Sequence, residues 1–497
     1  MFLASEKQAT VKAHPFSRAR RGTQGDALRV LHSCLPLRRP VKGGVMAGKK
    51  SSPEDGHSSR VIRVVFFALL LDLLGFTLIL PLLPSILDHY SQTGDGVYQS
   101  LQSIVDWFRE IVGVPMETKY NSVLFGGLIG SLYSLLQFLS SPVIGAASDK
   151  HGRRPLLLLT TVGLIFSYIL WAVSHSFSIF LLSRVVGGLC KGNVSLCTAV
   201  VADLPCPKAR SKGMAMIGVA FSLGFTLGPI MGAYFVLKLV DTELFYQGPA
   251  LLAVFFSIAD LLFIFLMLPE TLHKDNKGSL DSSGVQEVGD LLSPVSLFNF
   301  SAVTRTKEPP SRQRMHNLKV MGWVYFTYLF LFSGLEFTLS FLTHQRFKFS
   351  SMQQGKMFFF IGITMAAFQG GYARRIQPGR QIQTVRVAII VLIPAFLLIG
   401  FAQNLAVLYS GLFLYSFAAA IVVPCLSAQV SGHGTASQKG TVMGILRSLG
   451  ALARALGPIV ASSVYWLAGA EMCFIISSAF FIAPLLLLSR LERHKED

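Results

Sequence analysis

Twelve stretches of the chain are apolar over a length that can cross a lipid bilayer. A membrane-spanning helix needs about 20 mostly apolar residues. Six stretches precede a polar segment at residues 269–318, and six follow it. They cover residues 61–87, 121–144, 155–174, 177–202, 213–237, 249–268, 319–343, 354–373, 386–402, 405–428, 440–466 and 469–489. The pattern predicts an all-α membrane protein with 12 transmembrane helices in two six-helix bundles.

The composition agrees with burial of most of the chain in lipid. Of 497 residues, 52% are hydrophobic and 14% are charged, and the mean hydropathy is +0.54. Soluble domains carry about 25% charged residues, so a soluble globular protein is excluded. The six cysteines are scattered without metal-ligand spacing. We therefore expect no metal, no cofactor and no disulfide framework.

The net charge of +18 is distributed as membrane topology requires. Residues 1–63 hold 13 basic and 4 acidic residues, which is half of the net charge. Most other basic residues lie in short loops on one side of the predicted spans, as the positive-inside rule expects. The rule places both termini in the cytosol. A nucleic-acid partner is not expected, because no basic reader module is present.

The polar segments divide the chain into five parts. Residues 1–60 are predicted to be a basic, disordered cytosolic extension. The N-terminal bundle is predicted at residues 61–268 and the C-terminal bundle at 319–489, joined by a mobile cytosolic linker at 269–318. Residues 490–497 are predicted to be a cytosolic tail. Residues 1–45 are rich in Arg and poor in acids, like a mitochondrial transit peptide. The favoured alternative is an in-frame upstream extension of a product that starts at Met46.

The two predicted bundles share short sequence matches. Leu74–Leu78 (LGFTL) in the first span resembles Leu335–Leu339 (LEFTL) in the seventh, and Gly228-Pro229 matches Gly457-Pro458. The separation along the chain is larger for the first match than for the second. The difference is roughly the extra length of the loop at residues 88–119. Duplicated halves are an architecture of membrane transporters. The two bundles are therefore predicted to be pseudo-symmetric.

Seven ionisable residues lie inside the predicted spans: Asp72, Arg184, Lys191, Asp260, Glu336, Arg447 and Arg454. Each costs about 2.5–3.5 kcal/mol near the bilayer centre on insertion scales, so they are expected to face one another or water. Our hypothesis is a central cavity in which the cations attract an anionic substrate and a carboxylate takes a proton. Lys191 is the strongest candidate because it lies deep in the fourth span.

A structural role is the alternative for each of these residues. Asp72 and Arg184 can form a salt bridge that only stabilises the bundle. Arg447 lies near a helix end, where its side chain can extend to the membrane surface. Asp260 can face a pocket close to lipid. These alternatives remain open at the level of sequence.

The loop between the second and third spans carries the most specific motif. It reads GAASDKHGRRP and contains Gly145, Asp149, Gly152, Arg153 and Arg154. Gly152 tolerates a turn conformation that other residues resist, and a carboxylate can accept hydrogen bonds from a helix N-terminus. This segment, Gly145–Pro155, is called the signature loop here. It resembles the signature loop of the major facilitator superfamily, which implies that fold and a gating role for the loop.

Further motifs resemble the same superfamily. The fifth span contains Gly224, Gly228, Pro229 and Gly232, similar to an element of its antiporters, although Ala233 replaces a second glycine. Glycines four apart allow close helix packing. Arg184–Gly188 and Pro269–Leu272 resemble two more elements. Taken together, the chain resembles drug:proton antiporters of the tetracycline-exporter type.

The resemblance implies a secondary transporter that moves a small organic anion by alternating access, in exchange for a counter-ion or a proton. A second interpretation is a non-transporting membrane receptor or scaffold with the same fold. A membrane enzyme ranks third, because no catalytic constellation stands out. We expect a monomer in the lipid bilayer, with the plasma membrane as first choice and internal membranes, including the nuclear envelope, as alternatives.

Overall fold

The computed structural model describes residues 53–239, 244–272, 289–304, 311–435 and 437–491. Residues 51–497 group into one compact unit. The interpretations of residues 1–45, and most of the predicted N-terminal extension and C-terminal tail, lie outside the described residues. In the described part of the chain all regular secondary structure is helical, which confirms the predicted all-α class.

The first half consists of α2 (Pro53–Thr77), α3 (Leu83–Ser91), α4 (Gly96–Val112), α5 (Thr118–His151), α6 (Arg153–Ala172), α7 (Phe177–Cys190), α8 (Asn193–Ala202), α9 (Pro207–Leu239) and α10 (Leu244–Met267). The second half consists of α14 (Arg312–Phe347), α15 (Ser351–Gly371), η2 (Ala373–Arg375), α16 (Gln381–Gly400), α17 (Leu405–Val430), α18 (Lys439–Ala468), α19 (Ala470–Phe480) and α20 (Ile482–Ser489). Two short helices, α12 (Pro294–Phe298) and α13 (Ser301–Thr304), lie between them in sequence.

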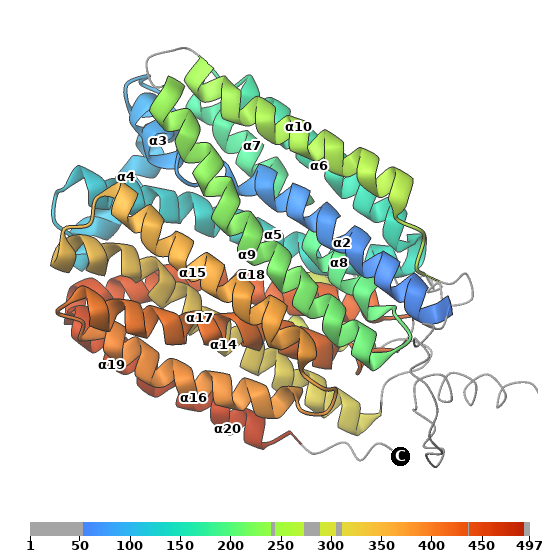
Figure 1. Cartoon of the computed structure of the whole chain (residues 1–497). Coiled ribbons are helices and arrows are strands. Elements are labelled where there is room, and N and C mark those ends of the chain that lie inside the picture. The colour runs from blue at the N-terminus through green and yellow to red at the C-terminus, as the bar shows by residue number, and fades with distance from the viewer. Residues whose placement is uncertain (1–52, 240–243, 273–288, 305–310, 436, 492–497) are drawn as a thin grey trace, which may run out of the picture. The chain divides into compact units, whose positions relative to one another are not determined.

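The long helices run alongside one another. Among the described residues, ten helical segments are long and apolar enough to cross a membrane, when α7 with α8 and α19 with α20 are each counted as one segment. The helices α2 and α15 lie at the first and eighth predicted spans, where α2 covers the first part of its span. In Figure 1, α6 and α10 lie on one flank and α16 and α20 on the opposite flank, while α5 and α18 lie in contact between them.

Three of the predicted spans are divided: the twelfth between α19 and α20 at Phe481, and the first and fourth at proline or glycine. The first span was expected as one segment over residues 61–87, broken near its end by Pro81 and Pro84. In the structure α2 ends at Thr77 and α3 begins at Leu83, because proline lacks the N–H that a continuing helix needs. The fourth span is interrupted at Lys191 and Gly192, which separate α7 from α8. This interruption was not predicted.

The loop after α3 folds into the amphipathic helix α4. Sequence periodicity favours a helix with an apolar face in this loop. Val105 and Val112 are buried as expected, but Ile104 and Ile111 are exposed. The apolar face is therefore narrower than the pattern indicates, because only one edge of α4 packs against α5 and α7.

Asp95 attaches α4 to α7. It caps the N-terminus of α4 through the N–H of Val97, at 2.9 Å, and accepts hydrogen bonds from the N–H and the hydroxyl of Ser178 at 3.1 and 3.0 Å. Burial raises the pKa of the Asp95 carboxyl, but these hydrogen bonds outweigh it and hold the pKa below its usual value. A lowered native pKa stabilises the fold at neutral pH, and this contribution is lost as the pH falls through the native pKa.

We expect Asp95→Ala to lower the free energy of unfolding by about 1 kcal/mol at neutral pH, as loss of a helix cap does. The difference from wild type should shrink in acid, because the wild-type carboxylate is then protonated. Thermal unfolding of the purified protein at pH 7 and near pH 2, below the lowered pKa of Asp95, measures both effects. Asp88→Ala, at an exposed acid on α3, is the matched control. An Asp95→Ala midpoint equal to wild type at pH 7 would contradict the assignment.

The predicted linker is partly helical where the structure describes it. Phe300 is fully buried and packs against Gly322 of α14, and Leu297 and Val303 are also buried. The helix α14 begins at Arg312, before the predicted start at residue 319. The linker was expected to be mobile because of its polar composition. These three apolar side chains explain why residues 294–304 pack against the bundle instead.

Candidate functional site

A buried ion pair joins the first and fourth spans. The Lys191 ammonium donates to both oxygens of the Asp72 carboxylate, each at 2.8 Å. The two side chains are 4% and 3% exposed. The ammonium also lies 4.7 Å from the ring centre of Phe76, one turn along α2 from Asp72. The pair brings together two of the predicted site residues, but Asp72 pairs with Lys191 and not with Arg184.

The interruption of the fourth span positions this pair. Lys191 follows the last residue of α7, and Asn193 is the first residue of α8. The Asn193 amide donates to Asp72 at 3.2 Å, and its oxygen accepts from the Thr160 hydroxyl at 2.7 Å. The break between α7 and α8 thus supplies Asp72 with a cation, Lys191, and with a neutral hydrogen-bond donor, Asn193. Charge pairs taken out of water need such additional hydrogen bonds.

One glutamine connects this pair to the second half of the molecule. The Gln137 amide nitrogen, on α5, donates to the backbone carbonyl of Lys191 at 3.2 Å. The Gln137 oxygen accepts from the Arg454 guanidinium, on α18, at 3.1 Å. Gln137 is itself buried. A single amide therefore joins the region of Lys191 to a cation of the opposite half.

Arg454 is close to the carboxylate on the seventh span. Glu336 on α14 interacts electrostatically with Arg454 and with Tyr415 of α17. Glu336 is exposed, in contrast to Asp72. Glu336 and Arg454 thus act on each other electrostatically, as a second carboxylate and cation. Gln137 therefore links the region of Asp72 and Lys191 to the region of Glu336 and Arg454.

The remaining predicted charges lie around these pairs. The Arg184 guanidinium lies over the rings of Trp171 and Phe180, at 5.1 and 5.5 Å from their centres. The expected alternative of an Asp72–Arg184 salt bridge is therefore wrong. The Arg447 guanidinium lies 5.1 Å from the ring centre of Phe221, in the first half, instead of extending to a membrane surface. Asp260 is 1% exposed, so it does not face a pocket next to lipid.

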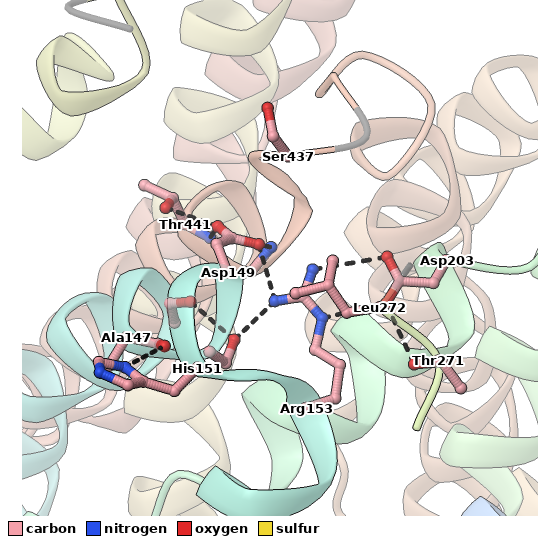
Figure 2. Close-up of polar contacts among 12 residues, drawn as sticks. Ala147, Asp149, His151, Arg153, Asp203, Thr271, Leu272, Ser437 and Thr441 are labelled. Carbon is pink, nitrogen blue, oxygen red and sulfur yellow. Dashed lines mark hydrogen bonds and ion pairs between the residues drawn. The ribbon is translucent and has the colours of Figure 1, made fainter. Parts of the chain in front are cut away.

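The signature loop binds the first turn of α18. Asp149 accepts hydrogen bonds from the backbone N–H of Gly440 at 2.8 Å and of Thr441 at 2.6 Å, and from the Thr441 hydroxyl at 2.7 Å. Figure 2 shows the Asp149 carboxylate pointing at this turn. Free N–H groups at a helix N-terminus favour a carboxylate. Asp149 thus joins the two halves of the molecule at the end that carries the signature loop. This end is called the signature-loop end here.

Arg153 extends the same network toward the rest of the first half. Its guanidinium contacts Asp149 at 2.7 Å and Asp203, which follows α8, at 3.0 Å. The Asp203 carboxylate also accepts from the Thr271 hydroxyl at 3.2 Å. These contacts are drawn in Figure 2. Arg153 is completely buried, so two carboxylates balance its charge.

Gly152 lets a carboxylate cap α6. Its φ of +109° is strained for any residue with a side chain, and a Cβ there would lie 2.6 Å from a Glu270 oxygen. Glu270 accepts from the N–H groups of Arg153 and Arg154 at 3.0 and 3.1 Å. The Arg154 guanidinium donates to the carbonyl of Phe265 at 2.6 Å. The loop is held to α10 on one side and to α18 on the other.

Glycines allow the two halves to touch at this end. A Cβ on Gly440 would collide with the Arg153 guanidinium and the Gly145 carbonyl, and a Cβ on Gly444 would lie 2.7 Å from the Ser141 carbonyl. The fifth-span glycines make a different contact, within the first half. A Cβ on Gly224 would lie 2.6 Å from Leu73 of α2, one on Gly228 would meet Thr77 at the end of α2, and one on Gly232 would meet Leu78 and Pro81, between α2 and α3. Pro229 lies inside α9.

Several residues of this network were not selected from the sequence. Gln137 and Asn193 are polar residues inside apolar spans, which was the one signal available for them. Asp203 and Thr441 lie next to loops, where polar residues are common. Glu270 belongs to a motif whose contact with α6 could not be foreseen. Among the described residues, no group of three His, Cys, Asp or Glu could hold a metal ion.

Comparison with known proteins agrees with this architecture. The sequence profile of the Major Facilitator Superfamily matches residues 65–458. The chain belongs to the Major Facilitator Superfamily. It is thus a member of a superfamily of membrane transporters, and the resemblance seen in the signature loop is confirmed.

Individual relatives narrow the comparison within the Major Facilitator Superfamily. The chain is 57% identical over 475 residues to major facilitator superfamily domain-containing protein 10 of Mus musculus, covering 96% of this chain and 99% of the relative. It is 26% identical over 444 residues to the class B tetracycline resistance protein of Escherichia coli, covering 85% and 96%. The crystal structure of the human organic anion transporter MFSD10 (TETRAN) matches with a TM-score of 0.84 at 58% identity, covering 88% of this chain and 100% of that one.

Proposed function

We propose that the protein is a secondary active transporter that exchanges a small organic anion for a counter-ion or proton by alternating access. The observation that carries the proposal is Gln137, which bonds the backbone carbonyl of Lys191 in one half and the Arg454 guanidinium in the other, so that each half places a cation next to this link. An anion that binds both cations would contact both halves at once. Such a ligand couples its own binding to the relative position of the halves.

The carboxylates supply the exchange. Asp72 occupies Lys191 in the present state through two hydrogen bonds. An anionic substrate would compete with Asp72 for the ammonium, so Lys191 would bind the carboxylate and the substrate in turn, as an exchange cycle requires. The printed name of the human relative, an organic anion transporter, supports the same substrate class.

The signature-loop end acts as the gate in this proposal. Asp149, Arg153 and Asp203 keep this end closed here. The distribution of basic residues along the sequence supports a cytosolic position for this end and for both termini. Opening to the cytosol would break the contacts of Asp149 with α18 while leaving the Arg153–Asp203 pair within the first half.

Uptake into proteoliposomes tests the proposal. Purified protein is reconstituted, and entry of a labelled organic anion is compared with entry of a labelled organic cation of similar size, with and without a pH gradient. We expect saturable uptake of the anion only. Empty liposomes and protein carrying Gly440→Leu, which obstructs the gate sterically, are the controls. Uptake restricted to cations, or absent for a panel of anions and cations, would refute the proposal.

A further inference from the structure

Arg447 on α18 is a cation without an ionic partner in the described part of the chain. Its Nε is buried and makes no hydrogen bond there. Lys191 and Arg454, the cations of the proposed site, each interact with a carboxylate. The Arg447 guanidinium contacts the ring of Phe221, which offsets only part of the cost of an unpaired charge. Arg447 is therefore available to an anionic group from a ligand.

A row of phenylalanine rings leads from Arg447 to Lys191. The Arg447 guanidinium lies 5.1 Å from the ring centre of Phe221. One turn along α9, the ring of Phe225 lies 6.2 Å from that of Phe221, with 17° between the ring planes. The ring of Phe76, on α2, lies 6.2 Å from that of Phe225 and 4.7 Å from the Lys191 ammonium. Phe76, Phe225 and Phe221 are called the aromatic row here.

The aromatic row faces the second half of the molecule. The helix α9 lies between α2 and α15 (Figure 1). Its Gly224 packs against α2, and its Thr226 meets a glycine of α15. With 3.6 residues per turn, Phe221 and Phe225 lie on the face between these two contacts, and Arg447 reaches this face from α18. Phe225 is nevertheless 44% exposed, so this face leaves room for a ligand.

We propose that the substrate is an elongated aromatic dianion, whose rings lie along the aromatic row and whose second acidic group binds Arg447. The first acidic group binds Lys191 in place of Asp72. This inference rests on the proposed function and names the class of organic anion. Aromatic rings gain specific contacts with other rings that saturated rings do not make, and a guanidinium binds a carboxylate through two parallel hydrogen bonds. Arg447 is thus a specificity-determining residue.

The second acidic group also adds a contact with the second half. Lys191 and the aromatic row belong to the first half, and Arg447 belongs to the second. The other role open to Arg447 is to hold the halves together through its contact with Phe221. That role would affect the transport of every substrate alike. A role in binding instead changes the preference between a dianion and a monoanion, because specificity is a difference of two affinities.

Competition for uptake into proteoliposomes tests the inference. The labelled substrate is naphthoate, an aromatic monoanion. The unlabelled competitors are naphthoate, a naphthalene dicarboxylate with its acids at opposite ends, and the decalin dicarboxylate, which is its saturated analogue. We expect wild type to bind the naphthalene dicarboxylate about tenfold more tightly than naphthoate, since a hydrogen bond to a charged group contributes at least this factor. It should also bind the naphthalene dicarboxylate more tightly than the decalin dicarboxylate.

Two variants assign these preferences to residues. Arg447→Gln should reduce the preference for the naphthalene dicarboxylate over naphthoate from about tenfold to about twofold. Phe221→Leu should reduce the preference for the naphthalene over the decalin dicarboxylate, because leucine keeps an apolar side chain but has no ring. Arg374→Gln, at an exposed arginine of η2, is the matched control and should keep both preferences.

The inference and the proposed function fail in different ways. Folded Arg447→Gln that binds both naphthalene anions more weakly but keeps the wild-type preference would overturn the inference, since Arg447 would then only hold the halves together. If this variant does not fold, the wild type still provides a test. Wild-type protein that takes up naphthoate without preferring the dicarboxylate would overturn the inference, although the proposed function would stand. Absence of uptake of naphthoate and of every other anion would refute both.

Discussion

Replacing Lys191 by glutamine is expected to abolish organic-anion uptake. The ammonium is the buried cation next to the interruption of the fourth span, and glutamine keeps much of its length without the charge. Removing one partner of a buried ion pair costs about 3–5 kcal/mol when the other charge stays. Asp72 can lower this cost by binding a proton. Uptake of a labelled anion into proteoliposomes should fall to the background of empty liposomes.

A double variant separates the loss of function from a loss of stability. Lys191→Gln with Asp72→Asn removes both charges, so no unpaired ion is left in the bundle. We expect it to recover the thermal stability lost in Lys191→Gln but not the uptake. Lys356→Gln, at an exposed lysine on α15, is the matched control. Normal uptake by the folded double variant would show that the pair is only structural.

Replacing Asp149 by asparagine is expected to slow transport by at least tenfold. The carboxylate accepts three hydrogen bonds from the first turn of α18, and asparagine turns one acceptor into a donor facing another donor. A hydrogen bond to a charged group contributes about 1.5–3 kcal/mol, and 1.4 kcal/mol corresponds to a factor of ten in an equilibrium. The closed state of the signature-loop end should therefore lose most of its population, which limits the rate of the cycle.

Distance measurement between spin labels checks the cause of this slower rate. Labels at the exposed residues Lys208 and Arg374 report the separation of the two halves at the signature-loop end. We expect Asp149→Asn to shift the distribution toward longer distances. His151→Gln is the control, because the exposed His151 ring hydrogen-bonds the carbonyl of Ala147 in its own helix. An unchanged distribution, together with wild-type uptake, would remove Asp149 from the gate.

The sequence alone predicted the architecture well, because long apolar stretches report directly on helices in a bilayer. The twelve stretches, the proline break after α2 and the signature loop are local features. The helix interruption at Lys191 and Gly192 escaped prediction, since glycine is common inside transmembrane helices and a lysine does not by itself end one. The packing of residues 294–304 was also missed, because three apolar side chains are hidden in a polar stretch.

The partners of the charged residues could not be predicted, for a physical reason. Which helices face each other is decided by packing over the whole bundle, so Asp72 could equally have met Arg184 or Lys191. The seven charges were found from the cost of placing them in lipid, which is independent of partner choice. Gln137 was missed because a neutral amide carries a smaller cost and gives a weaker signal.

The hydrogen bond from Gln137 reaches the main chain of residue 191, and not its side chain. Every amino acid at that position offers the same oxygen. This connection between the two halves is therefore independent of the side chain at position 191, so a substitution there removes the ammonium without removing the link.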